Sequence, residues 1–330
     1  MTQETLLKIS SSPHVHSGNS ISAAMRDVII ALLPATALSI YFFGLYALAI
    51  IVTSIASCLL AEYASQKFRK VDITINDYSA ALTGLLFALI IPPATPLWLV
   101  FIGGTISIVI GKQVFGGLGN NLFNPALVGR AILVASWPVY MTRFVSPFDG
   151  VTSATPLGII GEINKQFAGG LIPDTNLMAS LPPLSTLMTG SIAGSLGETS
   201  AIALILGGLY LIFKKHIDWK IPLLYISTVF TLALIFNGPY DRLWYATYNI
   251  FAGGLLIGAF FMATDWVTSP TTKKGRIIYA IGLGLLTFLI RKGAGLPEGV
   301  AYSIILMNMV TPLIDRYTRG RVFGEVKKHG

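Results

Sequence analysis

The chain has 330 residues, of which 53% are hydrophobic and only 12% are charged, and its mean hydropathy is +0.70. A soluble domain carries about 25% charged residues, so this composition excludes an ordinary soluble protein and predicts a polytopic membrane protein. The net charge of +8 is first of all evidence about orientation, because Lys and Arg are enriched in the cytoplasmic loops of membrane proteins. It indicates no nucleic-acid partner, because no basic stripe with interleaved aromatic residues is present.

Apolar segments long enough to cross a bilayer recur along the whole chain. They predict an all-α protein with about ten transmembrane helices, several of them broken. The predicted spans are 24–43, 46–66, 78–91, 97–115, 126–140, 184–213, 221–236, 244–263, 277–290 and 300–314. The segment 184–213 is either one broken span or a short re-entrant piece followed by a span. Gly44 marks a tight turn between the first two spans, and Pro92 and Pro93 end the third.

The predicted spans divide into two halves of five. Residues 1–140 form an N-terminal tail and a first five-helix repeat, and residues 181–330 form a second repeat with a basic tail. An odd number of spans per half inverts the second repeat relative to the first. Residues 112–119 and 291–297, each before the last span of its half, resemble one another. Inverted repeats with broken helices place ligand or ion sites at the repeat interface. Gly-rich packing faces can produce the same likeness by chance.

The distribution of Lys and Arg predicts the orientation of the chain. With a cytoplasmic N-terminus, the protein lies in the cell (inner) membrane with its basic segments on the cytoplasmic side: the links at 67–70, 112, 214–215 and 273–276 and the C-terminal tail. Both termini are then cytoplasmic, and the long segment 141–180 is extracytoplasmic. Arg291 and Lys292 fall outside, against the rule, so we expect them to have a specific partner.

Few residues suggest metal chemistry or processing. The single cysteine, Cys58, lies in a predicted span and forms no internal disulfide. His14 and His16 have metal-ligand spacing, but a polar N-terminal tail is their expected setting, and we predict no metal site. The first twenty residues lack an apolar core and predict no cleavable signal peptide.

The segment 141–180 is the longest without a spanning pattern, and loops of this length usually carry function or are disordered. It contains Asp149, then Thr152, Ser153, Ala154 and Thr155. One interpretation is a capped turn, since Asp-Gly is a turn signal and hydroxyls satisfy nearby backbone groups. The spacing also resembles the flavinylation motif D-x-x-[ST]-[GA]-A-[ST], with Ser153 where Gly is commonest.

The flavinylation motif implies that Thr155 carries FMN through a phosphoester bond made by a flavin transferase. In that reading Ser153 and Ala154 allow close approach of the modifying enzyme, and Asp149 helps to hold a metal at the transferase. Thr152 belongs to the recognition sequence. Because the segment lies outside the bilayer, we expect removal of the Thr155 hydroxyl to cost little stability, within about 0.5 kcal/mol.

The motif at 149–155, with the segments 25–28, 124–126, 194–200 and 262–265, resembles the D subunit of the Rnf complex, which is homologous to the B subunit of the sodium-translocating NADH:quinone reductase. The resemblance covers nearly the whole chain. It implies an electron carrier in a ferredoxin:NAD oxidoreductase that translocates Na⁺ or H⁺, with covalent FMN and a second, non-covalent flavin such as riboflavin. It implies as partners the A, B, C, E and G subunits of Rnf, above all the extracytoplasmic G subunit, which is a flavoprotein.

Ionisable residues inside spans are costly and usually functional. Arg130 follows a break at Asn124 and Pro125 and is a candidate to hold an anionic flavin or a carbonyl. Glu198 and Asp265 lie at helix breaks and are candidates for an ion path, with helix capping as the alternative. For Glu62, near a span end, we expect a snorkelling surface carboxylate.

Two other functions remain open from the sequence. One is the quinone-reducing B subunit of the NADH:quinone reductase, which the short N-terminal region disfavours. The other is a flavin-free secondary transporter or channel, since these too contain inverted repeats and broken helices. The motif ending at Thr155 separates a flavin-bearing protein from a solute carrier, because a solute carrier has no need of it.

Overall fold

The computed structural model describes residues 20–170, 175–293 and 299–320, and within these ranges the chain is helical apart from connecting segments and one isolated antiparallel bridge between Val145 and Thr152. The α-helices are α1 (Ile21–Arg69), α2 (Ser79–Leu89), α3 (Leu97–Ile108), α4 (Pro125–Ser136), α5 (Pro138–Met141), α6 (Pro156–Ala168), α7 (Thr175–Ala179), α8 (Leu184–Thr189), α9 (Ala201–Phe213), α10 (Lys220–Ile235), α11 (Arg242–Phe251), α12 (Leu255–Ile257), α13 (Lys273–Gly293) and α14 (Val300–Thr318). The π-helical segments are η2 (Val109–Gln113) and η4 (Gly258–Met262), and the 3-10 turns are η1 (Ile75–Asp77) and η3 (Leu196–Glu198).

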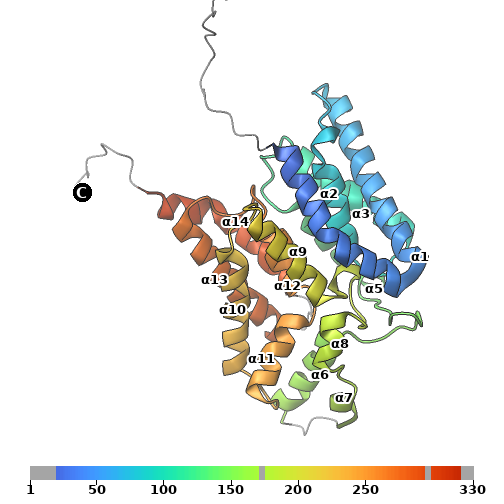
Figure 1. Ribbon diagram of the computed structural model, residues 1–330, viewed down its shortest axis with the longest axis vertical. Coiled ribbons are helices and arrows are strands. Elements are labelled where there is room, and N and C mark those ends of the chain that lie inside the picture. The colour runs from blue at the N-terminus through green and yellow to red at the C-terminus, as the bar shows by residue number, and fades with distance from the viewer. Residues whose placement is uncertain (1–19, 171–174, 294–298, 321–330) are drawn as a thin grey trace, which may run out of the picture.

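Local signals in the sequence start and stop these helices. Gly44 has φ 72° and ψ −160°, a conformation that favours glycine, and it divides α1 into two arms that run in opposite directions (Figure 1). This confirms the predicted turn between the first two spans. The Asn124 side chain accepts a hydrogen bond from the Ala126 N–H, and Pro125 occupies the first position of α4.

The helices gather into two groups that lie side by side (Figure 1). One group contains α1 to α4, the other contains α9 to α14, and α6, α7 and α8 lie together at one end of the molecule. Helices α1 and α9 pack against each other where the groups meet. A Cβ at Gly207 of α9 would lie 2.2 Å from the Ala31 carbonyl oxygen of α1, so glycine permits this close approach.

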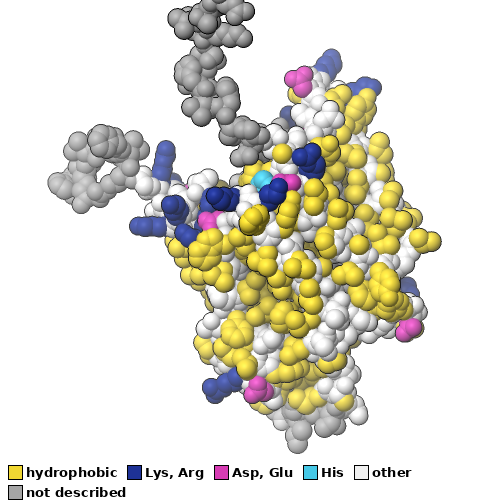
Figure 2. Space-filling model, in the orientation of Figure 1, with side chains coloured by type: hydrophobic (Ala, Val, Ile, Leu, Met, Phe, Trp, Pro, Cys, Tyr) yellow, Lys and Arg dark blue, Asp and Glu magenta, His cyan; other side chains and the backbone are white. Residues whose placement is uncertain are grey.

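The surface has the character of a membrane protein. A broad hydrophobic belt crosses the face seen in Figure 2, and Lys and Arg side chains gather toward the end where α1 begins and α14 ends. Within the described residues, α1 is the one helix long and apolar enough to cross a bilayer by itself. Helix α11 with the segment 255–262 qualifies as a second crossing if the pair, bent by 63°, is one broken span.

The region predicted as a polar loop contains more helix than its composition suggested. Helix α6 runs for 13 residues through the middle of 141–180 and buries Leu157, Ile160 and Ile163. Most other apolar helices are short, at 10–17 residues, and several continue into buried backbone that is not helical. Residues 192–200 are an example, since all are buried and only η3 within them is helical.

Candidate functional site

Thr155 lies at the start of α6, and its side chain caps that helix. Its Oγ1 accepts a hydrogen bond from the Gly158 N–H at 3.1 Å, and Pro156 occupies the first helical position. The residue is only 9% exposed, so the expectation of a loop hydroxyl that can be removed at little cost is wrong. A helix N-terminus favours negative charge, which suits a phosphoester on this oxygen.

The residues before Thr155 form a tight turn, as the Asp-Gly signal predicted. The Ser146 N–H donates to the Val151 carbonyl at 2.8 Å, and Gly150 has φ 65°. Ser153 is half-buried, and its N–H donates to Phe144 O at 3.1 Å. The other motif residues, Asp149, Thr152 and Ala154, are exposed. A modifying enzyme can therefore reach this side of the turn, although the acceptor oxygen itself is covered.

Glu198 lies between Thr155 and Arg130. One small cavity is lined by both Thr155 and Glu198, and a second by both Glu198 and Arg130. We call these the Thr155 cavity and the Arg130 cavity. Glu198 is 6% exposed and also forms a capping box with Ser195, whose N–H donates to Glu198 Oε2 at 3.5 Å. The Glu198 carboxylate therefore both forms a capping box and lines two internal cavities.

Asp265 lies in a different cavity. Its Oδ2 accepts from the Thr268 hydroxyl at 3.2 Å and its Oδ1 from the Val267 N–H at 3.4 Å, so it stabilises the turn at 266–268 and caps no helix. It lines a partly open cavity among α1, α2, η2, α9, η4 and the start of α4, which we call the large cavity because side chains from many segments line it; its internal volume is about 90 Å³. The π-helical segment η4 contributes Phe261 to the large cavity and Met262 to the Arg130 cavity.

The lining of the large cavity is mainly apolar, with a few polar groups. Asn121 donates through Nδ2 to the Phe123 carbonyl at 3.2 Å, while its Oδ1 is buried and has no partner among the described residues. An orphan acceptor in a cavity wall is a place for a ligand donor. Lys112 and His216 also line this cavity.

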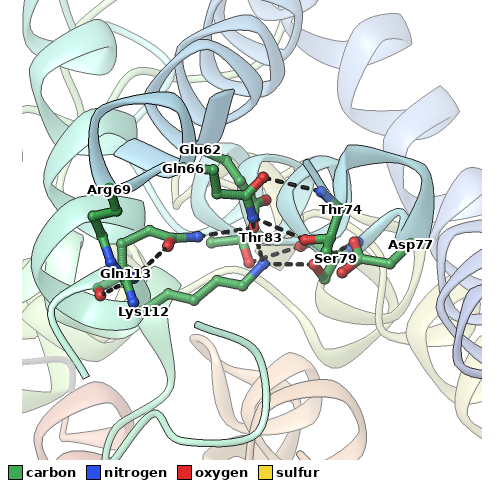
Figure 3. A network of polar contacts seen from close by, with 9 residues as sticks. All are labelled: Glu62, Gln66, Arg69, Thr74, Asp77, Ser79, Thr83, Lys112 and Gln113. Carbon is green, nitrogen blue, oxygen red and sulfur yellow. Dashed lines mark hydrogen bonds and ion pairs between the residues drawn. The ribbon is translucent and has the colours of Figure 1, made fainter. Parts of the chain in front are cut away.

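Glu62 is not a snorkelling surface residue, and that expectation is wrong. It is fully buried on the second arm of α1, and its Oε1 lies 2.6 Å from Nζ of Lys112 (Figure 3). Lys112, on η2, is only 2% exposed. The polar network around this pair also contains Gln66, Arg69, Thr74, Asp77, Ser79 and Gln113.

Arg291 has the specific partner that its unusual position predicted. Its guanidinium donates to the Asn249 carbonyl at 2.7 Å and to the Ala252 carbonyl at 3.2 Å. Both carbonyls belong to the end of α11, where the helix breaks before α12. Arg291 thus supplies donors that the interrupted helix lacks. The neighbouring Lys292 lies 4.6 Å from the ring centroid of Phe236.

The structure thus brings some predicted residues together and separates others. Thr155, Glu198 and Arg130 line adjoining cavities, whereas Asp265 lies apart from them. Sequence reasoning missed the buried pair of Glu62 and Lys112. The signal was present, because two opposite charges inside apolar segments predict an ion pair in a membrane protein. Within the described ranges no group of three His, Cys, Asp or Glu residues could hold a metal, and His14 and His16 lie outside those ranges.

The fold and the site define a class: an all-helical membrane protein with ionisable side chains buried around internal cavities. The chain belongs to the NQR2, RnfD, RnfE family, which matches residues 8–324. It is 48% identical to the D subunit of the proton-translocating ferredoxin:NAD(+) oxidoreductase complex of Clostridium ljungdahlii, over 98% of this chain and 97% of that protein. It is 46% identical to the D subunit of the Na(+)-translocating ferredoxin:NAD(+) oxidoreductase complex of Acetobacterium woodii, with the same coverage. It is 38% identical to the D subunit of the ion-translocating oxidoreductase complex of Actinobacillus succinogenes, over 97% of this chain and 98% of that protein.

Proposed function

We propose that this protein is the membrane electron-transfer subunit of an ion-translocating ferredoxin:NAD⁺ oxidoreductase complex of the Rnf type. The observation that carries the proposal is 46–48% identity, over nearly the full length of both chains, to two proteins with that description. Their names give different ions, H⁺ in one and Na⁺ in the other, and the coupling ion of this chain is one of these two.

The proposed site of covalent FMN is Thr155. Two observations support it: the motif residues before Thr155 form an accessible turn, and Thr155 Oγ1 stands at a helix N-terminus that favours phosphate. A bound flavin would supply one-electron and two-electron redox chemistry. The chain would hold its phosphate at the start of α6 and leave the ring free on the extracytoplasmic side, where the G subunit of Rnf is the proposed electron donor.

The large cavity is the proposed site of the second, non-covalent flavin, such as riboflavin. Its mainly apolar lining suits a planar aromatic ring system. The unpaired Asn121 Oδ1 would accept a ring N–H, and Lys112 would place a positive charge beside the ring. These two polar groups of the wall support the proposal.

Glu198 and Asp265 are proposed to line the route of the coupled ion, and Arg130, beside Glu198, is the proposed group for an anionic flavin or a carbonyl. The Thr155 and Arg130 cavities meet at Glu198, and the Arg130 cavity is separated from the large cavity by η4. Carboxylates at breaks in membrane helices are characteristic positions for ion sites. The alternative role, helix capping, is formed at Glu198 in η3, whereas Asp265 accepts within a turn; neither contact conflicts with an ion role.

The proposed topology is ten spans in two inverted repeats, with both termini in the cytoplasm. In the first repeat the second arm of α1 is followed by α2, α3 and α4, and in the second α10 is followed by α11, α13 and α14. The contacts match: α1 packs on α2 and α3, and α3 on α4, just as α10 packs on α11 and α13, and α13 on α14. The basic end of the molecule supports its assignment to the cytoplasm (Figure 2).

Purification through a tag on this chain tests the proposal. We expect the A, B, C, E and G subunits of Rnf to co-purify with it, and the denatured band of this chain to fluoresce under ultraviolet light, because FMN stays covalently attached. A band that co-purifies with none of these proteins and does not fluoresce would favour the flavin-free transporter instead. Co-expression without the flavin transferase is the matched control and should give a dark band in an assembled complex.

A further inference from the structure

Lys112 is a buried ammonium shared between a carboxylate and the wall of the large cavity. Its Nζ donates to Glu62 Oε1 at 2.6 Å and to Ser79 Oγ at 2.6 Å (Figure 3). Both Lys112 and Ser79 line the large cavity, whereas Glu62 is not part of its lining. The lysine therefore stands between Glu62 and whatever occupies the cavity.

The two oxygens of Glu62 have unequal environments. Oε1 accepts from Lys112, from Gln113 Nε2 at 3.0 Å and from Gln66 Nε2 at 3.2 Å. Oε2 is buried and has no hydrogen-bond partner among the described residues. A buried carboxylate oxygen without a donor is unfavourable, and it is the one position in this network where a proton can be added without displacing a donor.

Other charged groups surround the pair on every side. Asp77 accepts from the Ser79 hydroxyl at 2.6 Å, so it faces the lysine through one serine. Arg69 donates to the carbonyl of Gln113 at 2.9 Å. His216 and Asp265 line the same cavity as Lys112. Lys112 is thus the cation of this network that reaches the cavity, and its nearest anion is Glu62.

Lys112 can respond to a change of charge without a rearrangement of helices. It lies on the π-helical segment η2, a local irregularity of the kind found at functional positions, and its ammonium sits on a flexible four-carbon stem. In a buried setting, screening is weak, so one negative charge added in the cavity attracts this ammonium strongly. Movement toward the cavity weakens its contact with Glu62.

We propose that Lys112 is a redox-linked counterion: it stabilises negative charge added to the flavin of the large cavity and, by leaving Glu62, allows that carboxylate to take up a proton at Oε2. This rests on the proposed flavin occupancy of the cavity. The electron comes from the proposed electron-transfer activity. The proton comes from solvent and forms an O–H bond on Glu62, no other covalent bond changes, and one electron is matched by one proton.

The test compares Glu62→Gln with Glu62→Gln/Lys112→Met in the assembled complex. The two variants differ only in the side chain at 112, and the double variant contains no unpaired buried charge; Glu62→Gln leaves the ammonium without its carboxylate, so assembly of both variants is checked first. The midpoint potential of the extractable flavin is measured by redox titration. We expect the double variant to be at least tenfold harder to reduce, which is about 59 mV lower for one electron. Lys274→Met, at an exposed lysine of the same end, should leave the potential unchanged.

The second measurement is the infrared difference spectrum between reduced and oxidised complex. Wild type should gain a protonated carboxylic acid band on reduction, and Glu62→Gln should lack it. A flavin with unchanged potential in the double variant, or an unchanged band in Glu62→Gln, would overturn the role of Lys112 while leaving the flavin site intact. Absence of any extractable flavin from wild type would instead contradict the proposed occupancy of the cavity.

Discussion

At the scale of single residues, the side-chain oxygen of Thr155 has two roles. It is the proposed acceptor of FMN, and it caps α6 through the Gly158 N–H. Thr155→Ala should abolish the FMN mass on the peptide and lower the free energy of unfolding by about 1 kcal/mol, as for the loss of a helix cap. Thr155→Ser keeps the oxygen and should retain both. Mass mapping of proteolytic peptides and thermal melts measure the two effects separately.

The matched control is Thr152→Ala. Thr152 is exposed and pairs with Val145 through the backbone alone, so its replacement should leave the FMN on Thr155 and the stability unchanged. An FMN mass on Thr152, or fluorescence that persists in Thr155→Ala, would show that Thr155 is not the acceptor.

Glu198 and Asp265 can be tested without disturbing their local hydrogen bonds. Glu198→Gln and Asp265→Asn keep an oxygen acceptor but remove the charge that an ion would need. We expect Na⁺- or H⁺-linked transport in vesicles to fall more than flavin content does. Glu162→Gln is the control, because Glu162 is exposed on α6 and forms an exposed ion pair with Lys165, at 3.7 Å. Full transport in both variants would remove these carboxylates from the ion route.

At the scale of elements, Gly190 shows how a break in the helices is built. It ends α8 with φ 108°, and a Cβ there would lie 1.8 Å from the Thr199 carbonyl oxygen. Gly190→Ala should therefore lower the free energy of unfolding by more than about 1 kcal/mol. Gly161→Ala, in the interior of α6 with open space around it, should raise it by about 0.5–1 kcal/mol. The melting temperatures of the two variants are measured in the same detergent. Equal changes in melting temperature would contradict this explanation of the helix break.

The loop between α9 and α10 is tied to the start of α13 by Asp218. Partial burial favours the neutral carboxyl, but the Arg276 guanidinium at 2.9 Å and the Lys220 N–H outweigh it and hold the pKa of Asp218 below its usual value. The stabilisation is present above the unfolded pKa of about 3.9 and is lost as the pH falls through the lower folded value. Asp218→Asn should therefore lower the melting temperature at pH 7, with a difference from wild type that shrinks below about pH 4.

Asp241→Asn provides the comparison for Asp218, because asparagine can still cap α11 as Asp241 does through the Trp244 N–H. Its melting temperature at pH 7 should follow that of wild type. A constant difference between Asp218→Asn and wild type from pH 7 to pH 3 would show that the ion pair does not provide the acid-side stability.

The elements that sequence patterns predicted well are those with local causes. Gly44 and the Asn124–Pro125 break carry their own conformational signals, and both were found where predicted. Helix α6 was missed although Leu157, Ile160 and Ile163 recur at helical spacing, because the segment was too short and polar to resemble a span. The cavities could not be predicted, since the side chains that line each of them come from segments far apart in the chain.

At the scale of the whole molecule, the proposed route runs between two chemically different ends. Thr155 lies toward the end formed by α6, α7 and α8, and the large cavity lies nearer the basic end, with the Arg130 cavity between them. Electron transfer that begins at one end can drive ion movement from the other side of the membrane only if the two ends face different compartments. The orientation of the chain is therefore part of the mechanism.

The last prediction concerns that orientation. Alkaline phosphatase is active only outside the cytoplasm, so its fusion after Asn237, between α10 and α11, should be active, and its fusion after Lys274, at the start of α13, should be inactive. The physical reason is the basic side chains around Lys274, which favour the cytoplasmic side. A fluorescent protein fused at the same two positions should give the opposite pattern. Active phosphatase after Lys274 would invert the protein and would place Thr155 in the cytoplasm, away from an extracytoplasmic flavin partner.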